Sequence, residues 1–145
     1  MNIIPSLSIT GDALNAERLR MDVVSQNIAN ANTTRDANGG VYQRKVVNFE
    51  SVMSDALKVQ LPDGSSSPLR SVKVSGVTSD SRPGERVYNP SHPDADASGM
   101  VQMPNVEVAR EMVDLITSSR AYEANLTVAK NARAMADAAL RIGRP

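Results

Sequence analysis

The feature that most constrains this chain is a long segment near its C-terminus, Asn105 to Ile142, which contains neither proline nor glycine. Pro104 precedes the segment and Gly143 follows it, as is typical of residues that flank a helix. The Asn105 side chain is a suitable N-cap, because its oxygen can accept a hydrogen bond from a free first-turn amide. The segment therefore predicts one helix of roughly 57 Å, at about 1.5 Å per residue.

A helix of that length is unusual in a compact domain, where about 11–12 residues is typical. Its apolar residues step along the chain by four and three, which is the spacing of a coiled-coil seam. The predicted seam consists of Val108, Met112, Leu115, Tyr122, Leu126 and Ala129. Because one stripe cannot bury itself, the segment predicts contacts with other helices.

A second long helix is predicted from Ser6 to about Ala31. Its seam has a seven-residue repeat with a second apolar position, and comprises Leu7, Leu14, Met21, Ile28, Val24 and Ala31. The helix runs into an asparagine-rich stretch, and asparagine tolerates the left-handed conformation that ends many helices. Taken alone, the asparagines indicate a frayed helix end.

The middle of the chain favours β-structure. Strands are predicted at Val41–Phe49 and Ser71–Val77, with a further one at Glu85–Tyr88, whereas Ser51–Gln60 suits either a short helix or a strand. Leu61–Pro68 is rich in serine, proline and glycine and predicts a flexible loop.

These elements predict a mainly α fold with a small β insert. The long N- and C-terminal helices would form a coiled-coil-like, discontinuous helical assembly domain from residues 1–35 and 104–145. Residues 36–103 would form the β-rich insert, with its flexible loop at 61–68. The helical surface left over after the two helices pair predicts an assembly surface.

The composition narrows the function. Lys plus Arg and Asp plus Glu both number 16, so the formal net charge is zero, which disfavours nucleic-acid and membrane-surface binding. The chain has no cysteine, which excludes disulfides and cysteine-based metal sites. The N-terminus lacks the basic and apolar regions of a secretory signal, so the chain is expected in the cytoplasm unless a machine exports it without cleavage.

Two segments raise the question of chemistry. Asp94 to Gly99 mimics the start of a calcium loop, but Asn105 stands where that loop needs a bidentate glutamate, so an Asx turn is the better interpretation. His92 is the single histidine, and no nucleophile is marked beside it. We therefore predict no enzyme activity, no metal and no cofactor. A calcium-dependent module and a cytoplasmic coiled-coil adaptor remain as alternatives.

Three segments carry a family resemblance: SQNIANANT at Ser25–Thr33, EMVDLITSSRAYEANL at Glu111–Leu126, and YNPSHPDADASGMVQMPNV at Tyr88–Val106. The first two resemble signatures of the bacterial flagellar axial proteins, which include rod, hook and hook-associated subunits. The third, together with the short length, resembles the proximal-rod members of that family. Met100 departs from the pattern, which would have an aromatic residue after Gly99.

The resemblance implies a structural subunit of the flagellar basal body that polymerises helically through its terminal helices. Such a subunit transmits torque and forms the wall of the export channel. Ser25–Thr33, and Asn30 within it, become an assembly or export element. The implied partners are further copies, other proximal and distal rod proteins, the hook-basal-body adaptor at the membrane ring and the type III export apparatus. No nucleic acid or small-molecule substrate is implied. The implied location is the periplasmic rod, reached from the cytoplasm without signal cleavage; another short rod subunit is the near alternative.

Overall fold

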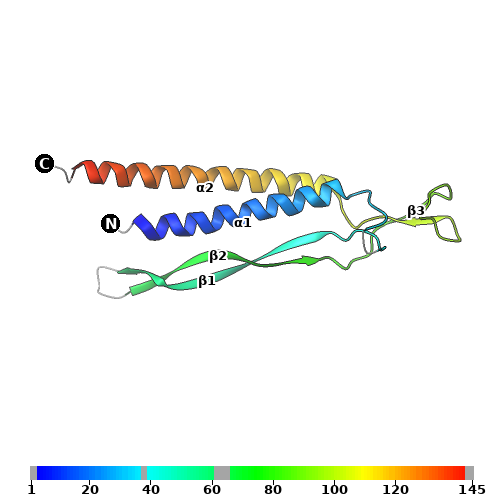
Figure 1. The fold of residues 1–145 in the computed structure, drawn as a ribbon, viewed down its shortest axis with the longest axis horizontal. Coiled ribbons are helices and arrows are strands. Elements are labelled where there is room, and N and C mark those ends of the chain that lie inside the picture. The colour runs from blue at the N-terminus through cyan, green and yellow to red at the C-terminus, as the bar shows by residue number, and fades with distance from the viewer. Residues whose placement is uncertain (1–2, 37–38, 61–65, 143–145) are drawn as a thin grey trace. The chain divides into compact units, whose positions relative to one another are not determined.

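The structure, a computed structural model, describes residues 3–36, 39–60 and 66–142. The elements in order are α1 (Ile3–Ala29), β1 (Lys45–Gln60), β2 (Ser66–Ser79), β3 (Arg86–Tyr88), β4 (Met100–Gln102) and α2 (Val108–Ile142) (Figure 1). Two long terminal helices therefore flank a β-containing middle along the chain, as predicted. The β content exceeds the expected small insert, because β1 has 16 residues and β2 has 14.

The end of α1 is set by hydrogen bonds rather than by a left-handed residue. The Asn30 amide donates to the carbonyls of Gln26 and Asn27 at 3.1 and 3.2 Å, and the Asn30 carboxamide donates to the Gln26 carbonyl at 2.8 Å. Within the described part of the chain, positive φ angles occur only at glycines, so none of the described asparagines adopts the left-handed conformation that asparagine tolerates. Asn30 therefore satisfies carbonyls of the last turn through both its backbone and its side chain.

Helix α2 begins at Val108 and not at the predicted Asn105. The Asn105 carboxamide is engaged elsewhere, since it accepts from the Arg44 backbone N–H at 2.8 Å and donates to the Asp80 carbonyl at 2.9 Å. Asn105 therefore does not cap the first turn of α2. Glu111 in the first turn and Arg141 in the last turn both suit the helix dipole.

Strands β1 and β2 pair with each other in a two-stranded sheet. The segment Ser51–Gln60, for which helix and strand were both open, is strand. Of the predicted loop, residues 61–65 lie outside the described residues and residues 66–68 belong to β2. Because an isolated two-stranded hairpin is only marginally stable in water, this long sheet needs other parts of the assembly or chain to cover it.

Strands β3 and β4 form a short antiparallel sheet in which Val87 pairs with Val101 and Tyr88 with Met100. Two glycines in this region lie close to other parts of the chain. A Cβ on Gly84 would overlap the Met103 carbonyl oxygen, so no side chain fits there. Gly99 has a φ of 75°, a backbone conformation that favours glycine. It also faces the Tyr88 ring.

The chain divides into two compact units that are each discontinuous in sequence. Unit 1 comprises Met1–Leu19, Phe49–Ser75 and Ser118–Pro145, and unit 2 comprises Arg20–Asn48 and Gly76–Thr117. Both helices and the β1–β2 sheet contribute residues to each unit. Neither helix, over its described residues, is long and apolar enough to cross a membrane.

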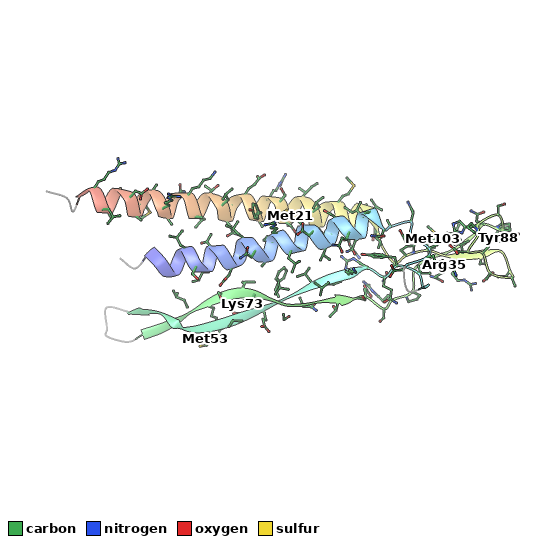
Figure 2. The ribbon with its side chains drawn as sticks, viewed as in Figure 1. Met21, Arg35, Met53, Lys73, Tyr88 and Met103 are labelled. Carbon is green, nitrogen blue, oxygen red and sulfur yellow. The ribbon has the colours of Figure 1, made fainter. Side chains whose placement is uncertain are left out.

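The buried residues of unit 2 include large side chains. The apolar ones are Val23, Val24, Ala31, Tyr42 and Val101, and the polar ones are Asn27 and Glu111. In unit 1, the buried residues among the described side chains are all small: Thr10, Ala16, Ser71 and Ser118. Met53 on β1, in unit 1, is 52% exposed and is labelled in Figure 2. Unit 2 therefore has the more substantial core.

Candidate functional site

The predicted seam of α2 is covered along only one of its edges. Leu115, Tyr122 and Ala129 are half-buried, whereas Val108, Met112 and Leu126 are exposed. The buried and half-buried residues include a series spaced by four and three: Glu111, Leu115, Ser118, Tyr122, Asn125, Ala129, Ala132 and Ala136. The covered face thus has the predicted spacing, but it consists largely of polar and small residues.

The predicted seam of α1 is more completely covered. Val24 and Ala31 are buried, and Leu14, Met21 and Ile28 are half-buried. Asn30, the predicted assembly residue beside this seam, is also half-buried. Leu7, near the start of the helix, is 37% exposed.

The first turns of α2 place polar residues inside and apolar residues outside. Glu111 is 0% exposed, while Met112, Val113 and Ile116 are 53%, 63% and 52% exposed. A helix of a self-sufficient globular domain shows the reverse arrangement, with its apolar stripe against the core. The exposed apolar residues Val108, Met112, Val113 and Ile116 are called the α2 apolar face below. A face of this kind is typical of a surface that another molecule covers.

Beneath that helix lies a buried polar cluster formed by Asn27, Tyr42, Arg44, Glu111 and the backbone of Lys45. Asn27, at the end of α1, is 0% exposed. Its Oδ1 accepts from the Tyr42 hydroxyl and from the Lys45 backbone N–H, each at 2.9 Å. Its Nδ2 donates to the Lys45 carbonyl and to Glu111 Oε2, again each at 2.9 Å. One carboxamide therefore links α1, the start of β1 and the first turn of α2.

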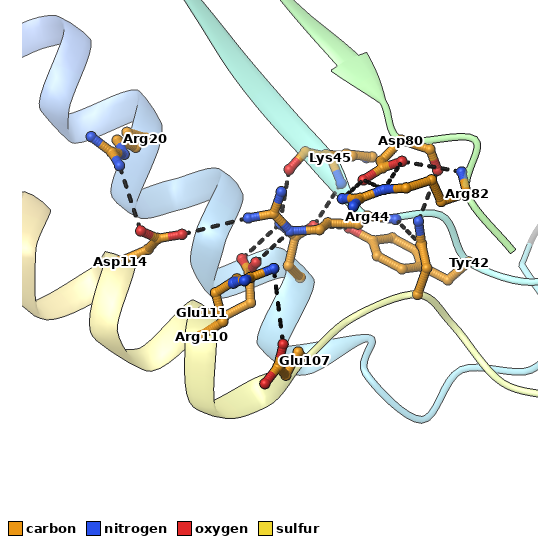
Figure 3. Close-up of polar contacts among 12 residues, drawn as sticks. Arg20, Tyr42, Arg44, Lys45, Asp80, Arg82, Glu107, Arg110, Glu111 and Asp114 are labelled. Atoms are coloured by element: carbon orange, nitrogen blue, oxygen red, sulfur yellow. Dashed lines mark hydrogen bonds and ion pairs between the residues drawn. The ribbon is translucent and has the colours of Figure 1, made fainter. Parts of the chain in front are cut away.

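The Glu111 carboxylate is held by a cation as well as by Asn27. Arg44 Nε donates to Glu111 Oε1 at 2.6 Å, and the Arg44 side chain is 19% exposed (Figure 3). A row of ion pairs extends from there, with Arg44 Nη2 at 3.5 Å from Asp114 and Arg20 Nη2 at 3.6 Å from the same carboxylate. Pairing is essential at this depth, because an unpaired buried carboxylate is strongly destabilising.

Tyr42 contributes both a packed ring and a hydroxyl donor. Its burial, together with the nearby Glu111 and Asp36 carboxylates, raises the pKa of the Tyr42 phenol. The phenol therefore stays protonated and donates to Asn27 at neutral pH. The Lys45 ammonium lies 5.9 Å from the centre of the Tyr42 ring, which is within range of a cation–π interaction.

The loop between β3 and β4 forms the predicted Asx turn. Asp96 Oδ1 accepts from the Ser98 backbone N–H at 2.8 Å and from the Met100 N–H at 3.0 Å. A hydrogen bond from the Ser98 hydroxyl, together with these backbone bonds, lowers the pKa of Asp96 to about 2, and the hydroxyl makes the largest contribution. Asp94 accepts from the Thr34 hydroxyl at 2.8 Å. Both carboxylates, which the calcium interpretation would have used, serve as hydrogen-bond acceptors that fix the loop.

The arginines around the site are paired with carboxylates. Across residues 3–36, 39–60 and 66–142, no group of three or more His, Cys, Asp or Glu side chains is arranged to hold a metal ion. An open cleft in unit 2 is lined by Arg44, Arg82 and Arg110, but each of these pairs with a carboxylate: Glu111, Asp80 and Glu107 respectively. What the arrangement provides is a fixed geometry beside an apolar surface.

Sequence reasoning missed the polar cluster. Local patterns indicate that Asn27 lies at a frayed helix end. For Glu111 they indicate only that its negative charge suits the start of a helix. The hydrogen bond between them joins residues 84 positions apart, which no local pattern reveals. The available signal was indirect: Asn27 and Glu111 each lie in one of the two segments that resemble a family signature.

Two family models match the chain at its ends. The model described as "Flagella basal body rod protein" matches residues 7–35, and the model described as "Flagellar basal body rod FlgEFG protein C-terminal" matches residues 97–142. These matches include the two signature segments and both halves of the Asn27–Glu111 contact.

Relatives named "Flagellar basal-body rod protein FlgC" align along almost the whole chain. The protein of Bacillus subtilis is 44% identical, with 99% of this chain and 100% of the relative covered. That of Borreliella burgdorferi is 38% identical, with 98% of each chain covered. That of Salmonella typhimurium is 36% identical, with 99% of this chain and 100% of the relative covered.

Proposed function

This chain belongs to the flagellar basal-body rod protein FlgC family and is a structural subunit of the proximal rod, and we propose that it polymerises helically, through its terminal helices, into the shaft that transmits torque and encloses the export channel. It has no catalytic activity and binds no cofactor in this role.

The inverted arrangement on α2 is the observation that carries the proposal. Glu111 and Ser118 are fully buried, while Met112, Val113 and Ile116 are more than half exposed. Further along the helix Val128, Met135 and Leu140 are exposed by 54%, 57% and 71%. Burying a large apolar side chain contributes about 1.5–3 kcal/mol, so covering this helix supplies a strong drive for association. Heterologous contacts that do not close into a ring are the kind that build a helical filament.

The partners in this proposal are further copies of the chain, other proximal and distal rod proteins, and the hook-basal-body adaptor at the membrane ring. The chain reaches the periplasmic rod through the flagellar type III export apparatus, without signal cleavage. Residues 1–35 and 104–145 act as the assembly domain, with coiled-coil-like packing between the helices, and residues 36–103 act as the insert. The predicted seam residues, from Leu7 to Ile28 on α1 and from Val108 to Ala129 on α2, lie in the contacts between helices.

A charge placed on the α2 apolar face tests the proposal. Met112→Asp and Ile116→Asp are introduced into a strain that lacks the native subunit. Thr117→Asp is the control, since Thr117 is exposed on the same turn but is already polar. We expect the two face variants to be exported and to fold as stably as the unmodified chain, yet to be missing from rods, because burial of an unpaired carboxylate is unfavourable.

The readouts are swimming, the rod content of isolated basal bodies and the melting temperature of each purified subunit. Thr117→Asp is expected to swim. Normal rods from both Met112→Asp and Ile116→Asp would contradict the role of this face in polymerisation.

A further inference from the structure

The hydrogen bonding around Asn27 is complete. A carboxamide offers two donor hydrogens and an oxygen with two acceptor positions. At Asn27 all four are used, at 2.9 Å each, and the residue is 0% exposed. Buried side chains with every polar position satisfied contribute to a single well-defined arrangement, whereas a partly satisfied group at this depth would be costly. Asn27 is therefore far more constrained than an asparagine at a frayed helix end.

Two of these four bonds imitate strand pairing. Asn27 accepts from the backbone N–H of Lys45 and donates to the carbonyl of the same residue. In an antiparallel sheet, a residue exchanges this same pair of bonds with the residue opposite. Lys45 is the first residue of β1, so the Asn27 carboxamide takes the place of a neighbouring strand at the start of β1.

The other two hydrogen bonds of the Asn27 carboxamide are made with side chains. The Tyr42 hydroxyl donates to the Asn27 oxygen, and the Asn27 nitrogen donates to Glu111 Oε2. Glu111 Oε1 is taken by Arg44, so the buried carboxylate has one neutral donor and one cationic donor. Asn27 thus reaches the first turn of α2, the helix that carries the α2 apolar face.

We infer that Asn27 is a positioning residue that holds the start of β1 and the first turn of α2 at the same time, so that the two terminal signature segments recognise each other through its carboxamide. Asparagine is required by this geometry. Aspartate lacks the donor and places a second carboxylate against Glu111. Glutamine is one methylene too long to reach both Lys45 groups. Alanine leaves the Lys45 amide and carbonyl, the Tyr42 hydroxyl and one Glu111 oxygen without their partner.

The residue acts on assembly only through α2, and this consequence rests on the proposed function. Asn27 does not reach the surface, but the turn that it holds bears Val108 and Met112. A variant at Asn27 is expected to fail in rod assembly with every residue of the α2 apolar face intact.

The direct test uses the purified full-length subunit, so its outcome does not depend on the proposed function. Asn27→Ala is compared with Asn32→Ala, which changes an exposed asparagine in the same segment. The first readout is the hydrogen-exchange rate of the Lys45 amide by nuclear magnetic resonance. Loss of its acceptor is expected to speed exchange about fivefold to tenfold, as loss of one hydrogen bond implies. Asn32→Ala is expected to leave the rate unchanged. Equal rates in the two variants would overturn the inference.

The second readout is rescue, which a role in filling space alone would not produce. Glu111→Gln is expected to lower the melting temperature of the otherwise unmodified chain, because it removes the partner charge of Arg44. In the Asn27→Asp background the same change is expected to raise the melting temperature. The amide introduced on α2 can donate to the carboxylate introduced on α1, and the like-charge contact disappears.

Two outcomes of the rescue experiment would refute the inference. One is that Asn27→Asp and Glu111→Gln lower the melting temperature additively. The other is that neither Asn27→Asp nor the double variant folds. If Asn27→Asp alone does not fold but the double variant does, the inference is supported.

Discussion

The two units of this chain differ in the size of the side chains that they bury. Unit 2 buries Tyr42 and Val101 together with a carboxylate and a carboxamide whose partners are all supplied from within the unit. Unit 1 buries only small side chains among those described, while Leu126 at 36%, Met135 at 57% and Leu140 at 71% remain exposed. Apolar burial is the main stabilising contribution to folding, so unit 1 gains less from its own contacts.

This difference bears on the proposed assembly of the subunit into a rod. Unit 2 combines a buried polar cluster with the exposed α2 apolar face. In unit 1, Leu126, Met135 and Leu140 of α2 are exposed without a comparable core among the described side chains. Under the proposed function, assembly covers the exposed apolar residues of both units. One glycine from each unit illustrates the difference: Gly84 in unit 2 is enclosed by the backbone of Met103 and Pro104, whereas a Cβ on Gly11 in unit 1 would meet nothing within 4 Å beyond its chain neighbours and its own helix backbone.

The largest effect is expected from Arg44→Met, which leaves the buried Glu111 carboxylate without its cation. Breaking a buried pair in this way destabilises by about 3–5 kcal/mol, so unit 2 should unfold at a much lower denaturant concentration. The control is Arg110→Met. Its partner Glu107 and its own side chain are 70% and 65% exposed, and such a surface pair contributes about 0–1 kcal/mol. Equal midpoints for the two variants in urea unfolding would remove the distinction between the units.

The two glycines provide a second test with opposite signs. Gly84→Ala forces a methyl group against the Met103 carbonyl and is expected to destabilise by about 1–3 kcal/mol, as overpacking does. Gly11→Ala adds a better helix former at an open position of α1 and is expected to stabilise the isolated chain by about 0.5–1 kcal/mol. Thermal unfolding followed by circular dichroism measures both. A destabilising Gly11→Ala would show that unit 1 is tightly packed around α1.

Truncation of apolar side chains sharpens the same contrast. Val101 is 2% exposed, and Val101→Ala is expected to destabilise by about 1.5–3 kcal/mol through lost burial and a cavity. Met135→Ala in unit 1 is expected to stay within about 0.5 kcal/mol in the isolated chain, as exposed positions do. In rod assembly the order should differ, since Met135 would then be covered. If urea unfolding shows that Met135→Ala destabilises the isolated subunit as much as Val101→Ala, unit 1 already buries that residue.

The smallest predicted effect is the loss of stability at low pH. Hydrogen bonds from Arg82 lower the pKa of Asp80 to about 2, and those from Ser98 and Met100 lower the pKa of Asp96 to about 2. Unfolded aspartate titrates near 3.9. Since the folded pKa is the lower one, the unfolded state binds more protons, and the stabilisation present above about pH 4 is lost as the pH falls toward about 2. Both residues belong to unit 2, and the β3–β4 loop that contains Asp96 should loosen in that range.

The measurement for this prediction is a carbon-detected titration of the two carboxyl groups by nuclear magnetic resonance. Asp96→Asn retains the acceptor oxygen for the turn and should abolish the pH dependence of the loop signals. Signals from the loop that do not change between about pH 4 and about pH 2 in the unmodified chain would contradict the prediction.

Much of this fold follows from periodicity. The four-and-three spacing of α2 and the seven-residue repeat of α1 predicted two long helices, and alternating apolar residues predicted β-structure between them. The start of α2 was predicted three residues early, because Asn105 bonds to Arg44 and Asp80 instead of capping the helix. Local sequence could not supply those distant partners. Periodicity likewise predicted which positions of α2 are spaced along one face, but not that Glu111 would be the buried residue beside an exposed Met112.

The polar cluster likewise depends on residues that are far apart in the sequence. The family resemblance singled out the segments of Asn27 and Glu111, but only their three-dimensional proximity shows that the two segments meet. The seam prediction for α1 needed no such information, since apolar spacing alone marks Val24 and its neighbours as covered residues.

Residue-resolved hydrogen exchange of the isolated full-length subunit tests most directly whether unit 2 is ordered by its own contacts and unit 1 by those of its neighbours in the rod. We predict that the helical amides of unit 2, at residues 20–29 and 108–117, are protected at least about tenfold more than the helical amides of unit 1, at residues 3–19 and 118–142, because low local burial permits local opening. Within α2, protection should fall along the helix beyond Thr117. Uniform protection along the whole of α1 and α2, or greater protection after Ser118 than before it, would contradict this division of the chain.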